Sequence, residues 1–261
     1  SAASDVYKRQ LYVSDSANQV IRQVGPGLSG RVETLAGTGE LGSKDGAAKD
    51  AAFNNPQGVA IDTRGYLWVT DSGNHTIRRI NLTRGIVETI AGKAGSPGWI
   101  DGMGDKARFN SPSGIAIEEE TVAQQYARQI SGEPPPPVCV IVADTDNGVL
   151  RRVKETGEVE TIRSSASPAV SASLTRSPQS PALPPVTFSS PVGVAVDPSG
   201  TIYVAETKAA RVRALLQNGV LVAASQPNTF TAPTGVAITE GGRVVVADRT
   251  NLAREIRFGE P

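Results

Sequence analysis

The stretch that decides the fold runs from Leu67 to Gly92 and reads LWVTDSGNHTIRRINLTRGIVETIAG. It contains three apolar or β-branched runs, LWVTD, TIRRI and VETIAG, separated by the turn sequences SGNH and LTRG. Glycine, asparagine, aspartate and serine adopt the backbone conformations that tight turns need. A fourth run, GVAID, ends at Asp62 just upstream. The pattern predicts four consecutive strands in one antiparallel sheet.

The same unit recurs along the chain in the same order. The first-strand sequence appears as PQGVAID, PSGIAIE, PVGVAVD and PTGVAIT. The shortest repeat distance, from Glu206 to Asp248, is 42 residues, which fits a propeller blade of about 40 to 45 residues. We therefore predict an all-β protein, a β-propeller of four-stranded antiparallel blades. The second strand appears five times, starting at Leu11 (LYVSD), Leu67 (LWVTD), Val140 (VIVAD), Ile202 (IYVAE) and Val244 (VVVAD).

Two interruptions lengthen the repeat. Residues 118–137, EEETVAQQYARQISGEPPPP, replace a tight turn; helix-forming residues from Glu119 to Ile130 precede an extended proline run. Residues 163–190 are rich in Ser, Pro and Ala with almost no charge, so we expect a disordered loop. Its PxxP spacings and its three Ser-Pro sites suggest contact with a modular domain or a proline-directed kinase. The sites are Ser167, Ser177 and Ser180.

Two glycine-rich connections join consecutive units. They read GTGELGSKDGAAKDAAFNNP from Gly37 and GKAGSPGWIDGMGDKARFNSP from Gly92. In both, an Asp-Gly pair and a segment of small residues precede Phe-Asn-x-Pro. We expect Phe53 and Phe109 to plug the interfaces between blades. With the strand copies, these connections resemble NHL repeats over most of residues 11–258. The resemblance implies a β-propeller, commonly with six blades.

The two ends of the chain shape the expected architecture. DVYKRQ, within residues 1–10, resembles a translated adapter sequence, so we assign the propeller to residues 11–261 and exclude the leader. On this count the unit at Leu11 has no first strand and the last unit has no fourth. We therefore expect an arc of about five blade units, a fragment of a larger propeller with exposed sheet edges.

Composition excludes several classes of partner. The 26 basic and 26 acidic residues balance, which disfavours a nucleic-acid or membrane surface. Without an apolar run of about 20 residues, the sequence predicts no membrane-spanning helix. Cys139 is the single cysteine, and its place in a strand predicts a small buried hydrophobic residue instead of a reactive thiol.

An acidic residue is followed seven positions later by an arginine in four of the units. A short hairpin turn would bring the two side chains together across neighbouring strands. A catalytic carboxylate should appear once, so we interpret the repeated pairs as architectural. The asparagine three positions after the acid (Asn18, Asn74, Asn147 and Asn251) is interpreted as closing an Asx-type turn. The pairs are Asp15/Arg22, Asp71/Arg78, Asp144/Arg151 and Glu206/Arg213.

No motif for catalysis or metal binding stands out, so we expect no enzyme activity, metal or cofactor. The run DTDNG from Asp144 fails the EF-hand spacing. His75 is the only histidine, which excludes a multi-histidine zinc centre of the kind found in propeller lyases similar to this family. We expect His75 to be an exposed turn residue.

Loops on a rigid scaffold are where binding usually resides. Turns between second and third strands share one face with the connections between blades, whereas residues 118–137 lie on the other. We place the partner site on the first face. Trp99 would be its anchor, with packing against its own blade as the alternative. The candidate residues are Asp45, Asn74, His75, Trp99, Asp101 and Asn147.

Three functions remain open. The favoured one is a non-catalytic scaffold that binds a protein or peptide through one propeller face. The first alternative is a propeller hydrolase or lyase with a central cluster of metal ligands. The second is RNA binding through a basic face, which the balanced charge disfavours.

Overall fold

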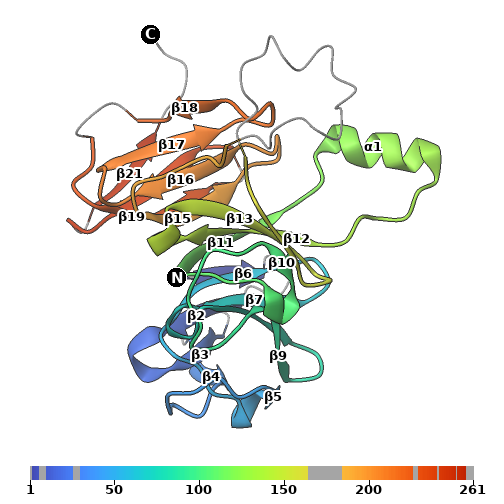
Figure 1. The fold of residues 1–261 in the computed structure, drawn as a ribbon, viewed down its shortest axis with the longest axis vertical. Coiled ribbons are helices and arrows are strands. Elements are labelled where there is room, and N and C mark those ends of the chain that lie inside the picture. The colour runs from blue at the N-terminus through green and yellow to red at the C-terminus, as the bar shows by residue number, and fades with distance from the viewer. Residues whose placement is uncertain are drawn as a thin grey trace.

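The computed structural model contains five small antiparallel sheets that follow one another along the chain, from the lower to the upper part of Figure 1. It describes residues 2–5, 10–25, 30–163, 184–225, 229–239, 241–250 and 252–256. Within each sheet, the main strands pair in chain order. The predicted all-β propeller of antiparallel blades is confirmed.

Each sheet forms one blade. Blade 1 consists of β1 (Ala2–Asp5), β2 (Gln10–Asp15), β3 (Val20–Val24) and β4 (Val32–Ala36). Blade 2 consists of β6 (Pro56–Ile61), β7 (Tyr66–Asp71), β8 (Thr76–Asn81) and β9 (Ile86–Gly92), with β5 (Gly46–Ala47) outside β9. Blade 3 consists of β11 (Pro112–Glu118), β12 (Cys139–Asp144), β13 (Val149–Lys154) and β14 (Glu158–Thr161), with β10 (Gly102–Met103) outside β14.

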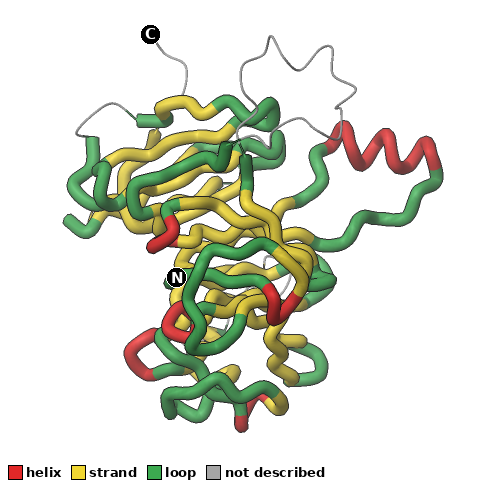
Figure 2. Tube along the Cα trace, viewed as in Figure 1, coloured by secondary structure: helices red, strands yellow, loops and turns green. Residues whose placement is uncertain are grey.

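The sheets of blades 4 and 5 have no additional outer strand among the described residues. Blade 4 consists of β15 (Pro191–Val196), β16 (Ile202–Glu206), β17 (Arg211–Leu215) and β18 (Leu221–Ala223). In the described part of blade 5 the strands are β19 (Pro233–Ile238), β20 (Val244–Asp248) and β21 (Leu252–Ile256). The α-helix, α1 (Val122–Ser131), stands away from the sheets, as Figure 2 shows. It confirms the helix expected in the insertion.

The decisive stretch pairs as predicted. Val59 of β6 faces Val69 of β7, Thr70 of β7 faces Ile77 of β8, and Ile77 in turn faces Ala91 of β9. The turn between β7 and β8 is a short 3₁₀ turn, Ser72–Asn74, followed by His75 in the left-handed conformation.

Two features of the strand count differ from the prediction. Blade 1 has a first strand, because β1 pairs with β2 through Ala2–Val13 and Ser4–Leu11. AASD has no apolar alternation, so the side-chain pattern could not reveal it. In addition, the Asp-Gly loops supply the outer strands β5 and β10, which pair with β9 and β14. Each glycine-rich connection therefore crosses the blade that it leads into and extends its sheet.

The core lies between blades. Four apolar clusters each join side chains of two consecutive blades, and each contains one phenylalanine located three residues before a first-strand proline. These plugs are Phe53, Phe109, Phe188 and Phe230, with at most 7% of their surface exposed. The predicted role of Phe53 and Phe109 is confirmed. Because one blade alone leaves its apolar sides uncovered, burial between neighbours is the main stabilising contribution.

The predicted disordered segment, residues 163–190, lies mostly outside the described residues, which resume at residue 184. Ser167, Ser177 and Ser180 are among those not described. The described part is packed. Arg163 forms a bridge to Pro185 and Thr187 one to Val149, while Phe188 fills the interface between blades 3 and 4. The prediction of disorder is therefore wrong for the described residues 184–190.

First strands of successive blades approach very closely at the glycine of the P-x-G motif. A Cβ atom at Gly58, Gly114 or Gly193 would collide with backbone of the next blade. Nearby, the residue after the acid donates its hydroxyl hydrogen to the carbonyl of the next first-strand proline. These donor–acceptor pairs are Ser16–Pro56, Ser72–Pro112, Thr145–Pro191 and Thr207–Pro233.

The same motif offers a matched test of this close approach. Gly114→Ala should lower the free energy of unfolding by about 1 to 3 kcal/mol, because its methyl group would strike the Val192 carbonyl. Gly235→Ala should change it by less than about 0.5 kcal/mol, since its Cβ would meet only Ala247, at 3.5 Å, among the described residues. Urea denaturation of both variants provides the measurement. Equal effects would contradict the proposed packing of first strands.

Candidate interaction face

In blades 2 to 5, the second strand ends in a carboxylate that fixes the plug preceding that blade. Asp71 accepts a hydrogen bond at 2.7 Å from the backbone nitrogen of Asn54, which follows Phe53. Such a charge-assisted bond is stronger than a neutral one, so it holds the plug at a defined depth. The same bond recurs behind the other plugs, in the pairs Asp144–Asn110, Glu206–Ser189 and Asp248–Thr231.

The paired arginine completes this cluster. Arg78 forms an ion pair with Asp71 at 2.9 Å, and both side chains are fully buried. Its guanidinium lies 4.8 Å from the centre of the Phe53 ring, a favourable cation–π distance. It also donates to the carbonyl oxygens of Lys44 and Ala52, at 2.9 and 3.0 Å. The arginine thus ties the glycine-rich connection to the blade beneath it.

Blade 3 repeats the arrangement. Arg151 bonds Asp144 at 2.9 Å, lies 4.9 Å from the centre of the Phe109 ring, and donates to the carbonyls of Ile100 and Arg108. The remaining predicted pairs also form: Glu206 binds Arg213, and Asp15 binds Arg22 with about 30% of each side chain exposed. All four contacts are cross-strand ion pairs.

The buried and half-exposed carboxylates differ in acidity. Burial raises the pKa of Asp71 and Asp144 above the ordinary 3.8, against the opposing effects of their hydrogen bonds and arginine partners. Partial burial also acts to raise the pKa of Asp101, but hydrogen bonds from Thr161 and the charge of Arg151 outweigh it and leave that pKa lowered. Asp101 therefore stays ionised beside Arg151.

Asp45 and Asp101, two of the candidate residues, occupy equivalent places in the two connections. Asp45 accepts from Arg78 at 2.7 Å and from the backbone nitrogen of Thr89 at 3.0 Å. Asp101 accepts from Arg151 at 2.8 Å and from the hydroxyl of Thr161 at 2.7 Å. Both carboxylates therefore attach their connection to the fourth strand of the blade, β9 or β14.

Asn74 and Asn147 are also internal ties. The Asn74 amide donates to Asp71 and to the carbonyl of Gly42, both at 2.7 Å. Asn147 donates to Asp144 and to the carbonyl of Gly98, both at 2.8 Å. This geometry corrects the expected Asx-type closure: the side chain donates to the acid and to the connection, while the 3₁₀ turn closes through the backbone.

His75 is expected from the sequence to be an exposed turn residue, and the structure differs from that expectation. It is half-buried, and its Nδ1 accepts a hydrogen bond at 3.1 Å from the backbone nitrogen of Ser111. Ser111 has a positive φ of 52° and directly precedes the first proline of blade 3. The imidazole thus connects the turn of blade 2 to the start of the next blade.

Trp99 remains available at the surface. Its indole nitrogen donates to the hydroxyl of Thr161 at 3.0 Å, yet 46% of the residue is exposed. Two further apolar residues of the same connection, Ile100 and Met103, are 53% and 54% exposed. We call Trp99, Ile100 and Met103 the apolar patch. Sequence reasoning found only its tryptophan; comparison with the first connection, which has small or polar residues there, would have revealed the other two.

The six candidate residues do not converge on one site. Asp45 and Asn74 belong to the cluster of blade 2, and Asp101, Trp99 and Asn147 to the equivalent cluster of blade 3, with His75 linking the two blades. The structure therefore contains two copies of one anchoring arrangement. Only the second copy displays the apolar patch.

Thiol and metal-ligating groups offer no second centre within the described residues. Cys139 is half-buried, and burial raises the pKa of its thiol, which lowers its reactivity. The described side chains contain no group of three or more His, Cys, Asp or Glu that could hold a metal ion. In the same part of the chain, no helix is long and apolar enough to cross a membrane.

Comparison with solved structures places the fold. The chain matches virginiamycin B lyase from Staphylococcus aureus with a TM-score of 0.57 and 11% identity, over 100% of this chain and 70% of that one. It matches a chain of a nidogen/laminin complex with a TM-score of 0.60 and 13% identity, over 95% and 73% respectively. Together with the blade topology, these likenesses define the class: the protein is a β-propeller.

Sequence comparison identifies the repeats. The family model described as NHL repeat matches residues 53–80 and 188–215. The chain is 46% identical over 76 residues to the protein SUPPRESSOR OF QUENCHING 1, chloroplastic, of Arabidopsis thaliana, covering 29% of this chain and 7% of that protein. It is 45% identical over 64 residues to NHL repeat-containing protein 2 of Gallus gallus, covering 24% and 9%. The chain therefore contains NHL repeats at residues 53–80 and 188–215, and it spans less than a tenth of the length of these two relatives.

Removing the arginine of a buried pair should cost far more stability than removing the arginine of the exposed pair. Arg151→Met should lower the free energy of unfolding by about 3 to 5 kcal/mol, because it leaves the buried carboxylate of Asp144 without its partner. Arg22→Met removes a partly exposed pair and should cost at most about 1 kcal/mol. Chemical denaturation of the two variants measures both values. A loss below about 1 kcal/mol for Arg151→Met would show that the cluster does not hold the blades.

Proposed function

We propose that this protein is a non-catalytic interaction module that binds a protein or peptide partner through the apolar patch on the connection that leads into blade 3. The observation that carries the proposal is a comparison within the chain. At the positions of Trp99, Ile100 and Met103, the first connection has Ser43, Lys44 and Ala47. It adopts the same anchored path with those residues, so the fold does not require the apolar ones.

The patch is displayed from a fixed backbone. The Gly98 nitrogen donates to the Phe109 carbonyl, Ile100 and Arg108 bridge, and the Asn147 amide holds the Gly98 carbonyl. Arg151 adds its bonds to the Ile100 carbonyl and to Asp101. A partner therefore meets side chains whose backbone is already ordered, which reduces the entropy cost of binding.

The chemistry of the patch suits a macromolecular partner. Tryptophan and methionine are enriched in the cores of protein interfaces, where a few large side chains provide most of the binding energy. About half of each patch residue is exposed, which leaves apolar surface that water solvates poorly. An apolar segment of a partner would cover that surface.

The alternative, a propeller hydrolase or lyase, would need metal ligands around the axis. One of the solved structures with this fold is a lyase, but at 11% identity the likeness carries only the fold. A cavity of about 400 Å³ lies along the first strands of blades 2 to 5. Its lining includes Gly58, Gly114, Gly193 and Gly235 with the guanidinium-bearing Arg249, which favours no metal-dependent chemistry there. Binding is therefore the better-supported function.

Exchanging residues between the two connections tests the proposal. Peptides would be selected from a random display library on the intact chain, and their affinity measured by fluorescence polarisation. The triple variant Trp99→Ser, Ile100→Lys and Met103→Ala, which installs the residues of the first connection, should weaken binding at least about tenfold. Its unfolding midpoint should stay close to that of the parent, because the anchoring bonds remain.

The reciprocal exchange is the control. Ser43→Trp, Lys44→Ile and Ala47→Met would place the same side chains on the first connection and should add a second binding site in a titration. Selected peptides that bind the first triple variant as tightly as the parent would refute the proposal.

A further inference from the structure

The insertion between β11 and β12 is an addition that the propeller itself does not need. Blade 2 closes the same connection with Asp62, Thr63, Arg64 and Gly65, where the Gly65 nitrogen donates to the Asp62 carbonyl. Blade 4 uses the equally short turn from Asp197 to Gly200. Residues 118–137 therefore require a reason other than the fold.

The insertion nevertheless contains local contacts that stabilise its helix. Thr121 and Gln124 form a capping box at the start of α1, and Gly132 closes its end in the left-handed conformation. Arg128 reaches back to Glu120 at 3.1 Å. A helix of ten residues is marginal alone in water, so these caps and this ion pair hold it in place.

The helix does not serve the propeller core. Tyr126 and Ile130, four positions apart and hence on one side of the helix, are 66% and 72% exposed. Figure 1 shows α1 projecting beyond the sheets. The helix instead contributes Gln125 and Arg128 to a hollow that it forms with the neighbouring turns.

That hollow has a volume of about 410 Å³ and lies between the turns of blades 2 and 3. Its apolar surface comes from Ile117, Val138 and residues 135–137, all prolines. Arg64 of blade 2 and Glu155 of blade 3 form an ion pair at 3.0 Å along one side. The size falls in the range of ligand sites, about 300 to 1,000 Å³.

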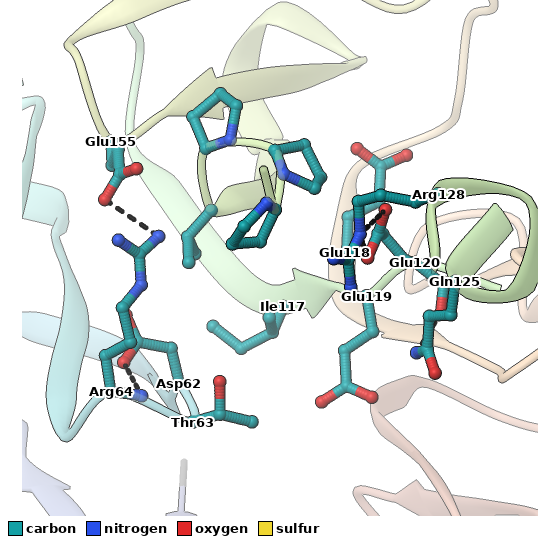
Figure 3. Close-up of a pocket in the computed structure, with 14 residues that line it drawn as sticks. Asp62, Thr63, Arg64, Ile117, Glu118, Glu119, Glu120, Gln125, Arg128 and Glu155 are labelled. Atoms are coloured by element: carbon teal, nitrogen blue, oxygen red, sulfur yellow. Dashed lines mark hydrogen bonds and ion pairs between the residues drawn. The ribbon is translucent and has the colours of Figure 1, made fainter. Parts of the chain in front are cut away.

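The carboxylates around the hollow are not equivalent. Glu118 is held by Arg152, Glu120 by Arg128, and Glu155 by Arg64, whereas no ion pair is found for the exposed Glu119 in the described part of the chain. In Figure 3, Glu119 extends away from the paired Glu120 and Arg128, across from Arg64 and beside Ile117. It also borders a second hollow that contains Asp197. The opening is therefore negatively charged above an apolar floor.

We propose that this hollow binds an extended basic peptide segment of a partner protein. The ammonium or guanidinium group of a lysine or arginine pairs with Glu119, and its aliphatic stem lies on Ile117 and the proline run, as long cationic side chains do on apolar surfaces. A proline run is suited to binding an extended peptide because its backbone is already restricted, so it loses little conformational entropy on binding. This second site is independent of the apolar patch.

Selection from a random peptide library tests the proposal on the intact chain. Binders would be counter-selected against a variant in which residues 119–138 are replaced by Thr-Arg-Gly, the sequence that follows Asp62 in blade 2. We expect the retained peptides to be enriched in lysine and arginine. Their affinity should fall at least about tenfold with Glu119→Lys and should weaken with added salt.

Two matched variants show whether the contact is made at Glu119 itself. Glu133→Lys makes the same charge change at an insertion residue that does not line the hollow, and should weaken affinity clearly less than Glu119→Lys, because its side chain would make no direct ion pair with the peptide. The triple variant of the apolar patch should leave affinity unchanged. Unfolding midpoints of all variants establish that each one folds.

Three outcomes would overturn the proposal: no peptide survives counter-selection, the surviving peptides lack basic residues, or Glu119→Lys and Glu133→Lys weaken binding equally. Self-association of the chain that disappears when the insertion is replaced would assign the hollow to a second copy and would likewise refute the basic peptide.

Discussion

The structure depends on one buried cluster that recurs where each connection meets its blade. A carboxylate at the end of the second strand binds the amide that follows a phenylalanine, and in blades 2 to 4 an arginine stacks on that ring. The phenylalanine fills the gap between two blades, so apolar burial and the ion pair act at the same place. Buried ion pairs alone are weak evidence of stability; here the pair positions the plug, and the plug provides the buried apolar area.

The repeat also serves as an internal control for function. Residues that recur in equivalent blades, such as Asp45 and Asp101 or Asn74 and Asn147, make equivalent internal bonds and account for the scaffold. Residues that depart from the repeat make no such recurring internal bonds, so the scaffold does not explain their presence. The two clearest departures are the apolar patch and the insertion with α1. Comparison of the copies therefore distinguishes residues that the fold requires from residues that are available for binding.

The sequence predicted the blades because second-strand copies such as LWVTD and VIVAD are apolar or β-branched runs that recur in a fixed order and end at an acid. It missed Phe188 and Phe230 as plugs because FSSP and FTAP lack the asparagine of the first two copies, and Phe188 follows a Ser/Pro-rich run. It could not place Trp99, whose hydrogen-bond partner lies 62 residues away. Contacts that depend on how a connection crosses the following blade leave no pattern in the neighbouring sequence from which they could be predicted.

Amide hydrogen exchange of the variant Phe109→Ala tests most directly whether neighbouring blades share one core. Phe109 precedes blade 3 in the chain but lies in a cluster with Trp68 and Ile77 of blade 2 as well as Val140 and Val142 of blade 3. The account predicts faster exchange in β8 and β12 together, with blade 4 unchanged. Faster exchange confined to blade 3 would contradict it, because each blade would then be stable by itself.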